Sequence, residues 1–207
     1  MAAMLRRPPA LSLAGLLALA AAGALAAPRA AEARPRKETY IFLVSRVDLT
    51  KGVPKEISAQ VATRLRSAIE AHKELSHTIP EGAPDPEAAP EKFKKYLRAR
   101  NQRAYKMNVE IREYSQEIEP SPKPNTQLVV VRVSLRLFAE TYPGRSMAIH
   151  GDGSATVKIE VGSKVREADR KEANSAALDE AVARAMEEVI VKLREPPPSK
   201  KKKRRKQ

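Results

Sequence analysis

The 207-residue sequence contains no cysteine and no tryptophan, and its aromatic residues are five tyrosines and three phenylalanines. Without cysteine the chain forms no disulfide, so a folded domain depends on its apolar core alone. It also lacks the cysteine that a bacterial lipoprotein carries after its signal, which excludes a lipid anchor of that kind. We therefore expect a core built mostly from Val, Leu, Ile and Ala.

Motifs for catalysis and cofactor binding are missing as well. The eight glycines form neither a phosphate-binding loop nor a dinucleotide-binding loop. The three histidines show no metal-ligand spacing, and His72 falls on the apolar stripe of a predicted helix. His150-Gly151-Asp152-Gly153 is read as a turn with glycines at positive φ, and Ser154 has no nucleophile elbow around it. We predict no catalytic residue, no cofactor, no metal and no small-molecule substrate.

The N-terminus has the organisation of a secretory signal peptide. Arg6 and Arg7 precede an uncharged run over residues 11–27, and Ala24-Leu25-Ala26 resembles a cleavage site. A mitochondrial transit peptide and an uncleaved membrane anchor are the alternatives. Scattered arginines, which a transit peptide would have, are missing, and the apolar run is short and rich in alanine for an anchor. We expect a signal peptide at residues 1–26 and a periplasmic or secreted mature protein.

The net charge of +14 is concentrated at the two ends of the chain. Residues 1–26 and 27–38 contribute +2 each, residues 39–199 contribute only +3, and residues 200–206 contribute +7. A uniformly basic nucleic-acid-binding domain would not divide its charge in this way. Residues 27–38 are read as a linker, residues 39–195 as one domain, and residues 196–207 as a disordered tail rich in Pro, Lys and Arg.

The pattern of apolar residues predicts strands in four places. Residues 40–44 are apolar throughout, which is typical of a strand covered on both faces. Residues 105–111, extendable to Ile118, and residues 128–138 alternate clearly. The fourth strand is predicted to run over 147–149, break at a bulge or corner at 150–153, and resume over 155–161. A short edge strand at 77–79 and proline-rich loops at 80–90 and 119–125 complete the pattern.

Helical periodicity predicts three helices. The first begins with Pro54 in its first position and runs to about Leu75, the second covers residues 90–103, and the third covers 167–194 before three prolines. The predicted fold class is α+β. We expect a two-layer sandwich with one mixed or antiparallel sheet of four to five strands and about three helices on a face.

Two basic segments are the candidate binding residues. The tail holds seven consecutive cations, and like charges in such a run repel one another and stay solvated. The second predicted helix is basic apart from its apolar positions, and it is either a solvated surface or a contact for an anionic partner. The predicted site for an anionic partner consists of Lys200, Lys201, Lys202, Lys203, Arg204, Arg205, Lys206, Lys94, Lys95 and Arg98.

The order of elements resembles the small α+β domain of bacterial envelope assembly factors. The segments that carry the likeness are residues 40–47, 57–69, "AYKMNVEI" at 104–111, "LVVVRVSLRLF" at 128–138 and the helix at 173–193. The families are the curli-secretion lipoproteins, the penicillin-binding-protein activator lipoproteins and the N-terminal domain of TolB. The resemblance implies a periplasmic adaptor or assembly module that binds partners and does not catalyse. It assigns no functional residue.

Three functional hypotheses follow. The first is an exported, non-enzymatic adaptor domain that its polybasic tail tethers to an anionic envelope surface or protein partner. The second is a nucleic-acid-binding protein that uses residues 90–103 together with the tail. The third is a hydrolase whose site the sequence does not reveal, which would need a cleft around His150 and Asp152. The oligomeric state and the identity of the partner stay open.

Overall fold

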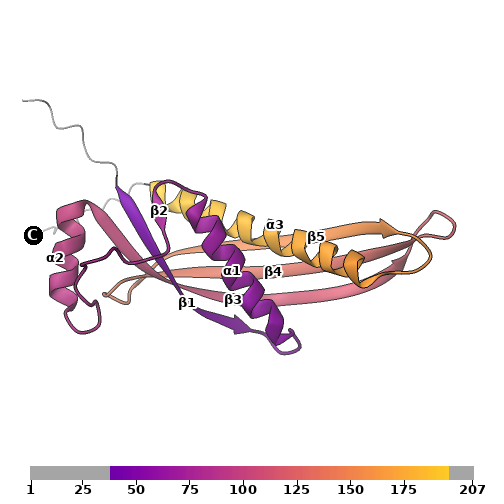
Figure 1. Cartoon of the computed structure of the whole chain (residues 1–207), viewed down its shortest axis with the longest axis horizontal. Coiled ribbons are helices and arrows are strands. Elements are labelled where there is room, and N and C mark those ends of the chain that lie inside the picture. The colour runs from indigo at the N-terminus through magenta and orange to yellow at the C-terminus, as the bar shows by residue number, and fades with distance from the viewer. Residues whose placement is uncertain (1–37, 196–207) are drawn as a thin grey trace, which may run out of the picture. The chain divides into compact units, whose positions relative to one another are not determined.

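A computed structural model describes residues 38–195, which form five strands and three helices (Figure 1). In chain order the elements are β1 (Thr39–Leu49), α1 (Lys55–Glu70), β2 (Leu75–Ser76), α2 (Pro90–Arg100), β3 (Gln102–Pro120), β4 (Gln127–Thr141), β5 (Met147–Val161) and α3 (Glu167–Arg194). The predicted α+β class is confirmed. Within the described residues no helix is both long enough and apolar enough to cross a bilayer.

All five strands belong to one mixed sheet with the order β2-β1-β3-β4-β5. Strand β1 is parallel to β2 and β3, and β3, β4 and β5 form an antiparallel meander, as predicted. The edge strand β2 has two residues, Leu75 and Ser76, and lies just before the predicted 77–79. The long meander forms most of the sheet in Figure 1.

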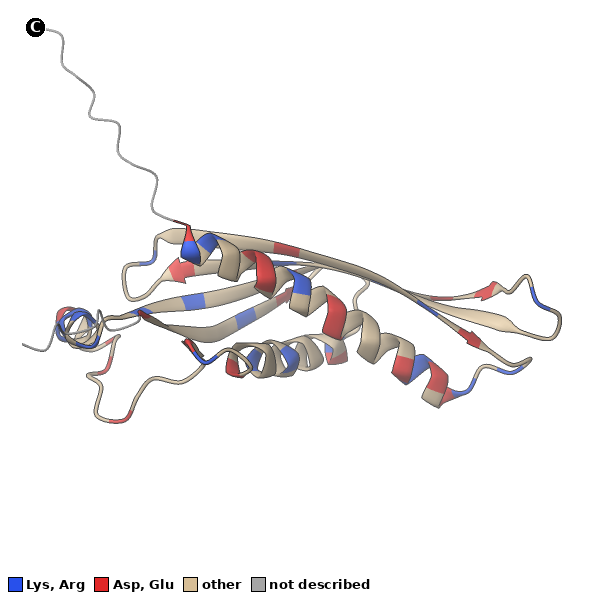
Figure 2. Ribbon diagram, turned by 90° about the horizontal axis from the view of Figure 1, so that it is seen from above, with Lys and Arg blue, Asp and Glu red and all other residues tan. Residues whose placement is uncertain are grey.

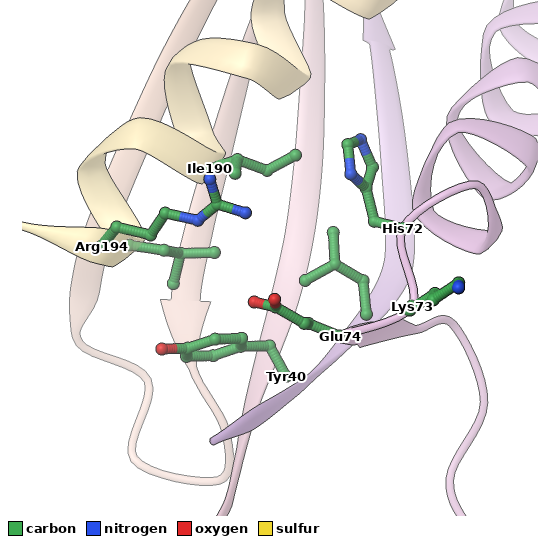
Figure 3. Close-up of a pocket in the computed structure, with 8 residues that line it drawn as sticks. Tyr40, His72, Lys73, Glu74, Ile190 and Arg194 are labelled. Atoms are coloured by element: carbon green, nitrogen blue, oxygen red, sulfur yellow. The ribbon is translucent and has the colours of Figure 1, made fainter. Parts of the chain in front are cut away.

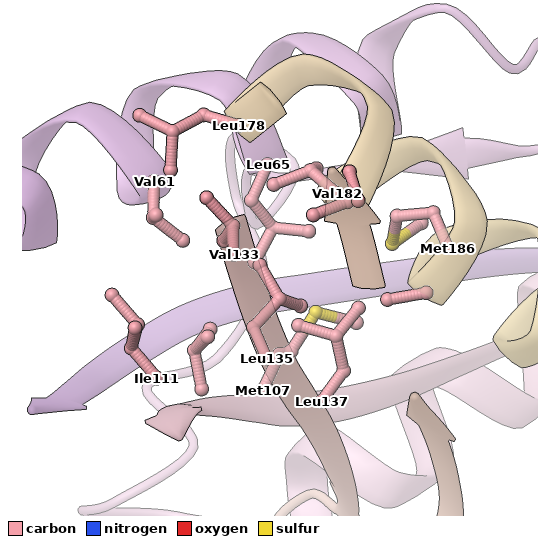
Figure 4. Packing of buried hydrophobic residues seen from close by; sticks show 14 of the residues in the cluster. Val61, Leu65, Met107, Ile111, Val133, Leu135, Leu137, Leu178, Val182 and Met186 are labelled. Atoms are coloured by element: carbon pink, nitrogen blue, oxygen red, sulfur yellow. The ribbon is translucent and has the colours of Figure 1, made fainter. Parts of the chain in front are cut away.

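Helices α1 and α3 cover one face of the sheet, which we call the helix face (Figure 1). Alternate residues of β4 point into it, so that Val133, Leu135 and Leu137 are buried. They pack against Leu65 of α1, against α3, and against Met107 of β3 (Figure 4). This cluster is aliphatic apart from three aromatic rings, which agrees with the core expected from the composition.

Helix α2 lies on the opposite face, which we call the open face, so the prediction of all helices on one face is wrong. Its Phe93 and Leu97 pack on Ile41 of β1 and Ala104 of β3, whereas the neighbouring Phe42 points into the main core. The topology explains the difference. The connection from β1 to β2 moves one way along the sheet, and the connection from β2 to β3 moves back past β1. Parallel crossovers are right-handed, so reversing the direction moves the helix to the other face.

Strand β5 is continuous through Gly151 and Gly153, so the predicted break, bulge or glycine turn at 150–153 is wrong. Among the described glycines, positive φ occurs only at Gly52 and Gly82. The two glycines of β5 instead let α3 approach closely. A Cβ atom at Gly153 would lie 2.0 Å from the carbonyl oxygen of Ala181, and one at Gly151 would lie 2.3 Å from that of Ala185. These glycines serve helix-to-strand packing.

Three side chains of α3 cover the outer edge of β5. Arg184 donates to the carbonyl oxygen of Ser154 (3.1 Å), and Lys192 donates to that of His150 (2.9 Å). Between them Glu188 accepts from the amide of Asp152 (2.6 Å). The spacing fits because four helical residues rise about 6 Å and two strand residues about 6.7 Å. An edge satisfied in this way is a poor template for pairing with another chain.

The predicted helix bounds match the structure best for α3, whose first turn is capped by a residue close by in the sequence. Helix α3 covers 167–194 as predicted, and Asp169 accepts a hydrogen bond from the amide of Arg166 at its start (2.8 Å). Helix α1 begins at Lys55, with Pro54 immediately before it, and ends at Glu70. Helix α2 ends at Arg100, since the next residues already belong to β3.

Candidate anion-binding groove

The beginning of β1, the end of α2 and the end of α3 meet at one end of the sheet, which we call the Thr39 end (Figure 1). On the helix face, Tyr40 lines a small cavity with Ile190 and Arg194 of the last turns of α3. On the open face, Ile41 packs on α2. The amide of Thr39 also donates to the carbonyl oxygen of Asn101, which follows α2 (3.2 Å). Both helices therefore end beside the start of β1, one on each face of the sheet.

Helix α2 brings a cluster of cations to this end. The helix is anchored by buried Phe93 and Leu97, with Tyr96 half-buried beside them, and its charged positions face solvent. Five of these positions are cationic and one, Glu91, is acidic (Figure 2). The cations are Lys92, Lys94, Lys95, Arg98 and Arg100. Asn101 then adopts a left-handed conformation with φ of 55° and turns the chain into β3.

A groove of about 470 Å³ runs between α2, the start of β3 and the turn after β4. Its floor includes the buried residues Leu97, Ala104 and Tyr105. The turn over 141–144 forms the far wall, and the amide of Tyr142 fixes it by donating to the carbonyl oxygen of Ala104 (2.9 Å). The ring of Tyr142 also packs edge-on against Phe93 of α2, with the ring centroids 6.1 Å apart.

Three cations line this groove, and they differ in how they are paired. The ammonium of Lys94 bonds Glu91 at 2.7 Å, and the guanidinium of Arg103 bonds Glu38 at 2.5 Å. The guanidinium of Arg98 makes no hydrogen bond or ion pair with any residue between 38 and 195, whereas its backbone carbonyl accepts from the amide of Asn101 (3.2 Å). Counting Glu38, the groove lining has a formal charge of +2.

Two titratable groups show how the groove is charged. The hydrogen bond and charge of Lys94 lower the pKa of Glu91, so this carboxylate in the first turn of α2 stays ionised. Burial raises the pKa of Tyr142, and the charges of Glu87 and Asp85 raise it further. Its hydroxyl is therefore neutral at physiological pH and adds no negative charge to the wall.

The smaller cavity on the helix face, about 140 Å³, suits an anion less well (Figure 3). Leu75 and Ile190 contribute apolar surface, and Glu74 stands among the cations of its rim. Burial, strengthened by a hydrogen bond to Glu38 at 2.9 Å, raises the pKa of Tyr40 to about 12. The carboxylate and the mixed lining give this cavity no strong preference for either sign of charge.

The predicted site residues are only partly brought together. Lys94 and Arg98 line the groove, whereas Lys95 lies exposed on α2 outside the groove lining. Residues 200–206 lie outside the described part of the chain. Sequence reasoning missed the contribution of Glu38 and of the turn at 141–144. The turn was visible as Tyr-Pro-Gly-Arg, but its position beside α2 depends on the pairing of β3 with β4.

The histidines lie apart from the groove. His72 is exposed and follows the end of α1, so its predicted place on the apolar stripe is wrong. Nδ1 of His77 lies 3.0 Å from a carboxylate oxygen of Glu70. Asp152, the residue that would orient a base in the hydrolase hypothesis, accepts hydrogen bonds from Arg136 instead. Within residues 38–195, no three His, Asp or Glu side chains are grouped as a metal site would need.

No protein-family model matches the chain, and no curated protein matches it. Several solved structures resemble it loosely. A neuraminyllactose-binding hemagglutinin homologue from Helicobacter pylori has 15% identity over 76% of this chain and 85% of its own, with a TM-score of 0.39. A minor lipoprotein from Acinetobacter baumannii has 9% identity over 76% and 94%, with a TM-score of 0.38.

A third example is an uncharacterised lipoprotein B from Nitrosomonas europaea, with 12% identity over 71% of this chain and 83% of its own and a TM-score of 0.31. The structural neighbours thus include bacterial lipoproteins. The likeness is too distant to support an inference about function. Membership of the particular envelope families that the sequence resembles stays a prediction.

Proposed function

We propose that the protein is an exported, non-enzymatic binding module whose Thr39 end docks on a polyanionic envelope surface or partner. The observation that carries this proposal is the shared location of two cationic sources. Helix α2 lies at the Thr39 end, and α3, which leads directly into the tail, ends there too. Lys200 is only five residues beyond Glu195, and five residues of extended chain span at most about 18 Å, which supports a docking surface common to α2 and the tail.

Electrostatic arithmetic supports a surface as the target. Each cation near an anionic membrane contributes on the order of 1 kcal/mol, and the tail and α2 together hold a dozen cations. The rest of the domain does not compete for the same target. Its open face alternates in sign, as in the cross-strand contacts of Arg132 with Glu117 and Glu119.

The decisive experiment measures binding of the full chain to vesicles with and without anionic lipid. We expect tight, salt-sensitive binding to anionic vesicles only. Removing residues 199–207 should weaken it at least a hundredfold, and the triple substitution K94Q/K95Q/R98Q should weaken it about tenfold. The matched control K51Q/K55Q/K164Q removes three exposed cations away from the Thr39 end, two at the junction of β1 and α1 and one after β5, and should change binding less than twofold.

The same variants test the nucleic-acid alternative. If duplex DNA were the target, its affinity would fall with a log–log salt slope near roughly −6 from seven tail contacts. Tight DNA binding that both the tail deletion and the α2 triple variant abolish, with no vesicle binding, would replace the proposal. If K94Q/K95Q/R98Q and its control K51Q/K55Q/K164Q weakened vesicle binding equally, net charge alone would account for binding and the Thr39 end would not be the docking surface.

Export is tested separately by the mature N-terminus. The signal-like sequence predicts cleavage after Ala26, so N-terminal sequencing of the protein from fractionated cells should begin at Ala27. An intact Met1 in a cytosolic fraction would contradict export, whatever the vesicle experiment shows.

A further inference from the structure

We infer that the groove between α2 and the turn at 141–144 is a binding site for a phosphomonoester group. This deepens the proposed function because the groove lies at the Thr39 end. Docking of the whole end needs only diffuse charge, whereas the inference concerns one pocket with a defined ligand chemistry.

The first argument is the placement of the cations. Lys94 and Arg98 are one helical turn apart on the same side of α2, with Leu97 below them. Arg103 enters from β3, so cations approach the groove from two different elements. A site that converges on one ligand requires this arrangement, whereas a solvated helix face does not.

The second argument is the unpaired guanidinium. Glu91 pairs with Lys94 and Glu38 pairs with Arg103, but within residues 38–195 no side chain pairs with the guanidinium of Arg98. A guanidinium presents a planar fork of donors that matches two oxygens of one phosphate. Arg98 can make this contact without first breaking an ion pair.

The third argument concerns charge and size. The lining carries +2, or +1 when Glu91, the partner of Lys94, is counted, so the groove favours an anion. A phosphomonoester carries close to −2 at neutral pH because its second pKa is about 6, so it gains more from this charge than a singly charged carboxylate or phosphodiester does. The volume of about 470 Å³ lies within the usual range for small-ligand sites, about 300–1,000 Å³, and the floor of Leu97 and Ala104 provides apolar contact for the body of the ligand.

The test titrates the full chain with inorganic phosphate and with glycerol 3-phosphate, followed by nuclear magnetic resonance. We expect the largest shifts at the Arg98 side chain and at the amides of Ala104 and Gly144. R98Q should raise the Kd about tenfold, and R98K should recover part of the loss. The control K164Q removes one exposed cation far from the groove and should change the Kd less than twofold.

The source of the phosphate is distinguished by a third arm, vesicles that contain phosphatidic acid. Stronger R98Q sensitivity there than with glycerol 3-phosphate identifies a lipid headgroup, and the reverse identifies a soluble metabolite. Equal effects of R98Q and K164Q, or shifts spread evenly along α2, would overturn the inference. Because the soluble ligands do not require the tail, failure here with tail-dependent vesicle binding intact would leave the proposed function standing.

Discussion

The two faces of the sheet are built in opposite ways. The helix face is closed by α1 and α3 and buries a continuous apolar cluster, with helix backbone pressed against Gly151 and Gly153. Within residues 38–195 the open face is covered at the Thr39 end, by α2 and the loop before it, and elsewhere carries paired charges such as Arg136 with Asp152. Apolar packing contributes far more to stability than exposed ion pairs do. The comparison teaches that one face supplies the stability and leaves the other free to vary in charge.

The largest effect is expected at Gly153 on the helix face. Gly153→Val should lower the free energy of unfolding by more than about 3 kcal/mol. This exceeds the usual range for overpacking because the clashing atom is a backbone carbonyl oxygen of α3. The control is Gly162→Val, since a Cβ at Gly162 meets nothing within 4 Å. Urea unfolding of both variants checks this. A loss no greater for Gly153→Val than for Gly162→Val would show that α3 does not need this close approach.

A smaller and more local effect is expected at Phe93, the anchor of α2 on the open face. Phe93→Ala should lower the free energy that holds α2 on the sheet by about 3 kcal/mol, because the Phe93 side chain is fully buried in the small second cluster. Hydrogen exchange should accelerate within α2, while β4 keeps its protection. If β4 exchanged faster to the same degree, the two clusters would unfold as one unit and the contrast between the faces would fail.

The smallest effect is expected for a charge pair on the open face. Asp152 accepts from Arg136 at 3.0 Å and 2.5 Å, and both side chains are partly exposed. Exposed pairs of this kind contribute between 0 and about 1 kcal/mol. Asp152→Asn should therefore lower the free energy of unfolding by less than about 1 kcal/mol. A loss above about 2 kcal/mol would mean that the open face contributes more than its exposure suggests.

The pH dependence of the same variant tests whether the ionised form of Asp152 is the one that stabilises the fold. The hydrogen bond from Arg136, together with its charge and that of Arg112, lowers the pKa of Asp152 below 3.8. The resulting stabilisation is present above pH 3.8 and is lost as the pH falls through the folded-state pKa. The difference in Tm between the parent and Asp152→Asn should be constant from pH 5 to 7 and shrink below about pH 4. A difference that grows in acid would contradict this assignment.

Much of the fold was predictable because its signals are local. Alternation in β4 over 128–138 reports directly which side chains enter the core. The polar first turn and the prolines after Arg194 mark both ends of α3. Of the candidate site, the cationic character of Lys94, Lys95 and Arg98 was visible, but not which of them share a groove.

The failures share one physical cause. Glycine most often marks a turn, so the sequence at 150–153 predicted a break. In the structure these glycines instead leave space for the backbone of α3, which lies some thirty residues later in the chain. His72 was placed by extending the helical period past the residue at which α1 ends. In both cases the outcome depends on contacts that no local window contains.

The sequence by itself determined the α+β class, the aliphatic core and the separation of strong positive charge from a nearly neutral domain. Periodicity and composition are properties of neighbouring residues, and they carry that information. Tertiary structure alone decided that α2 crosses to the open face, that Arg98 and Arg103 line one groove, and that α2 and α3 both end beside the start of β1. These results come from crossover handedness and strand pairing, which join segments far apart in the chain.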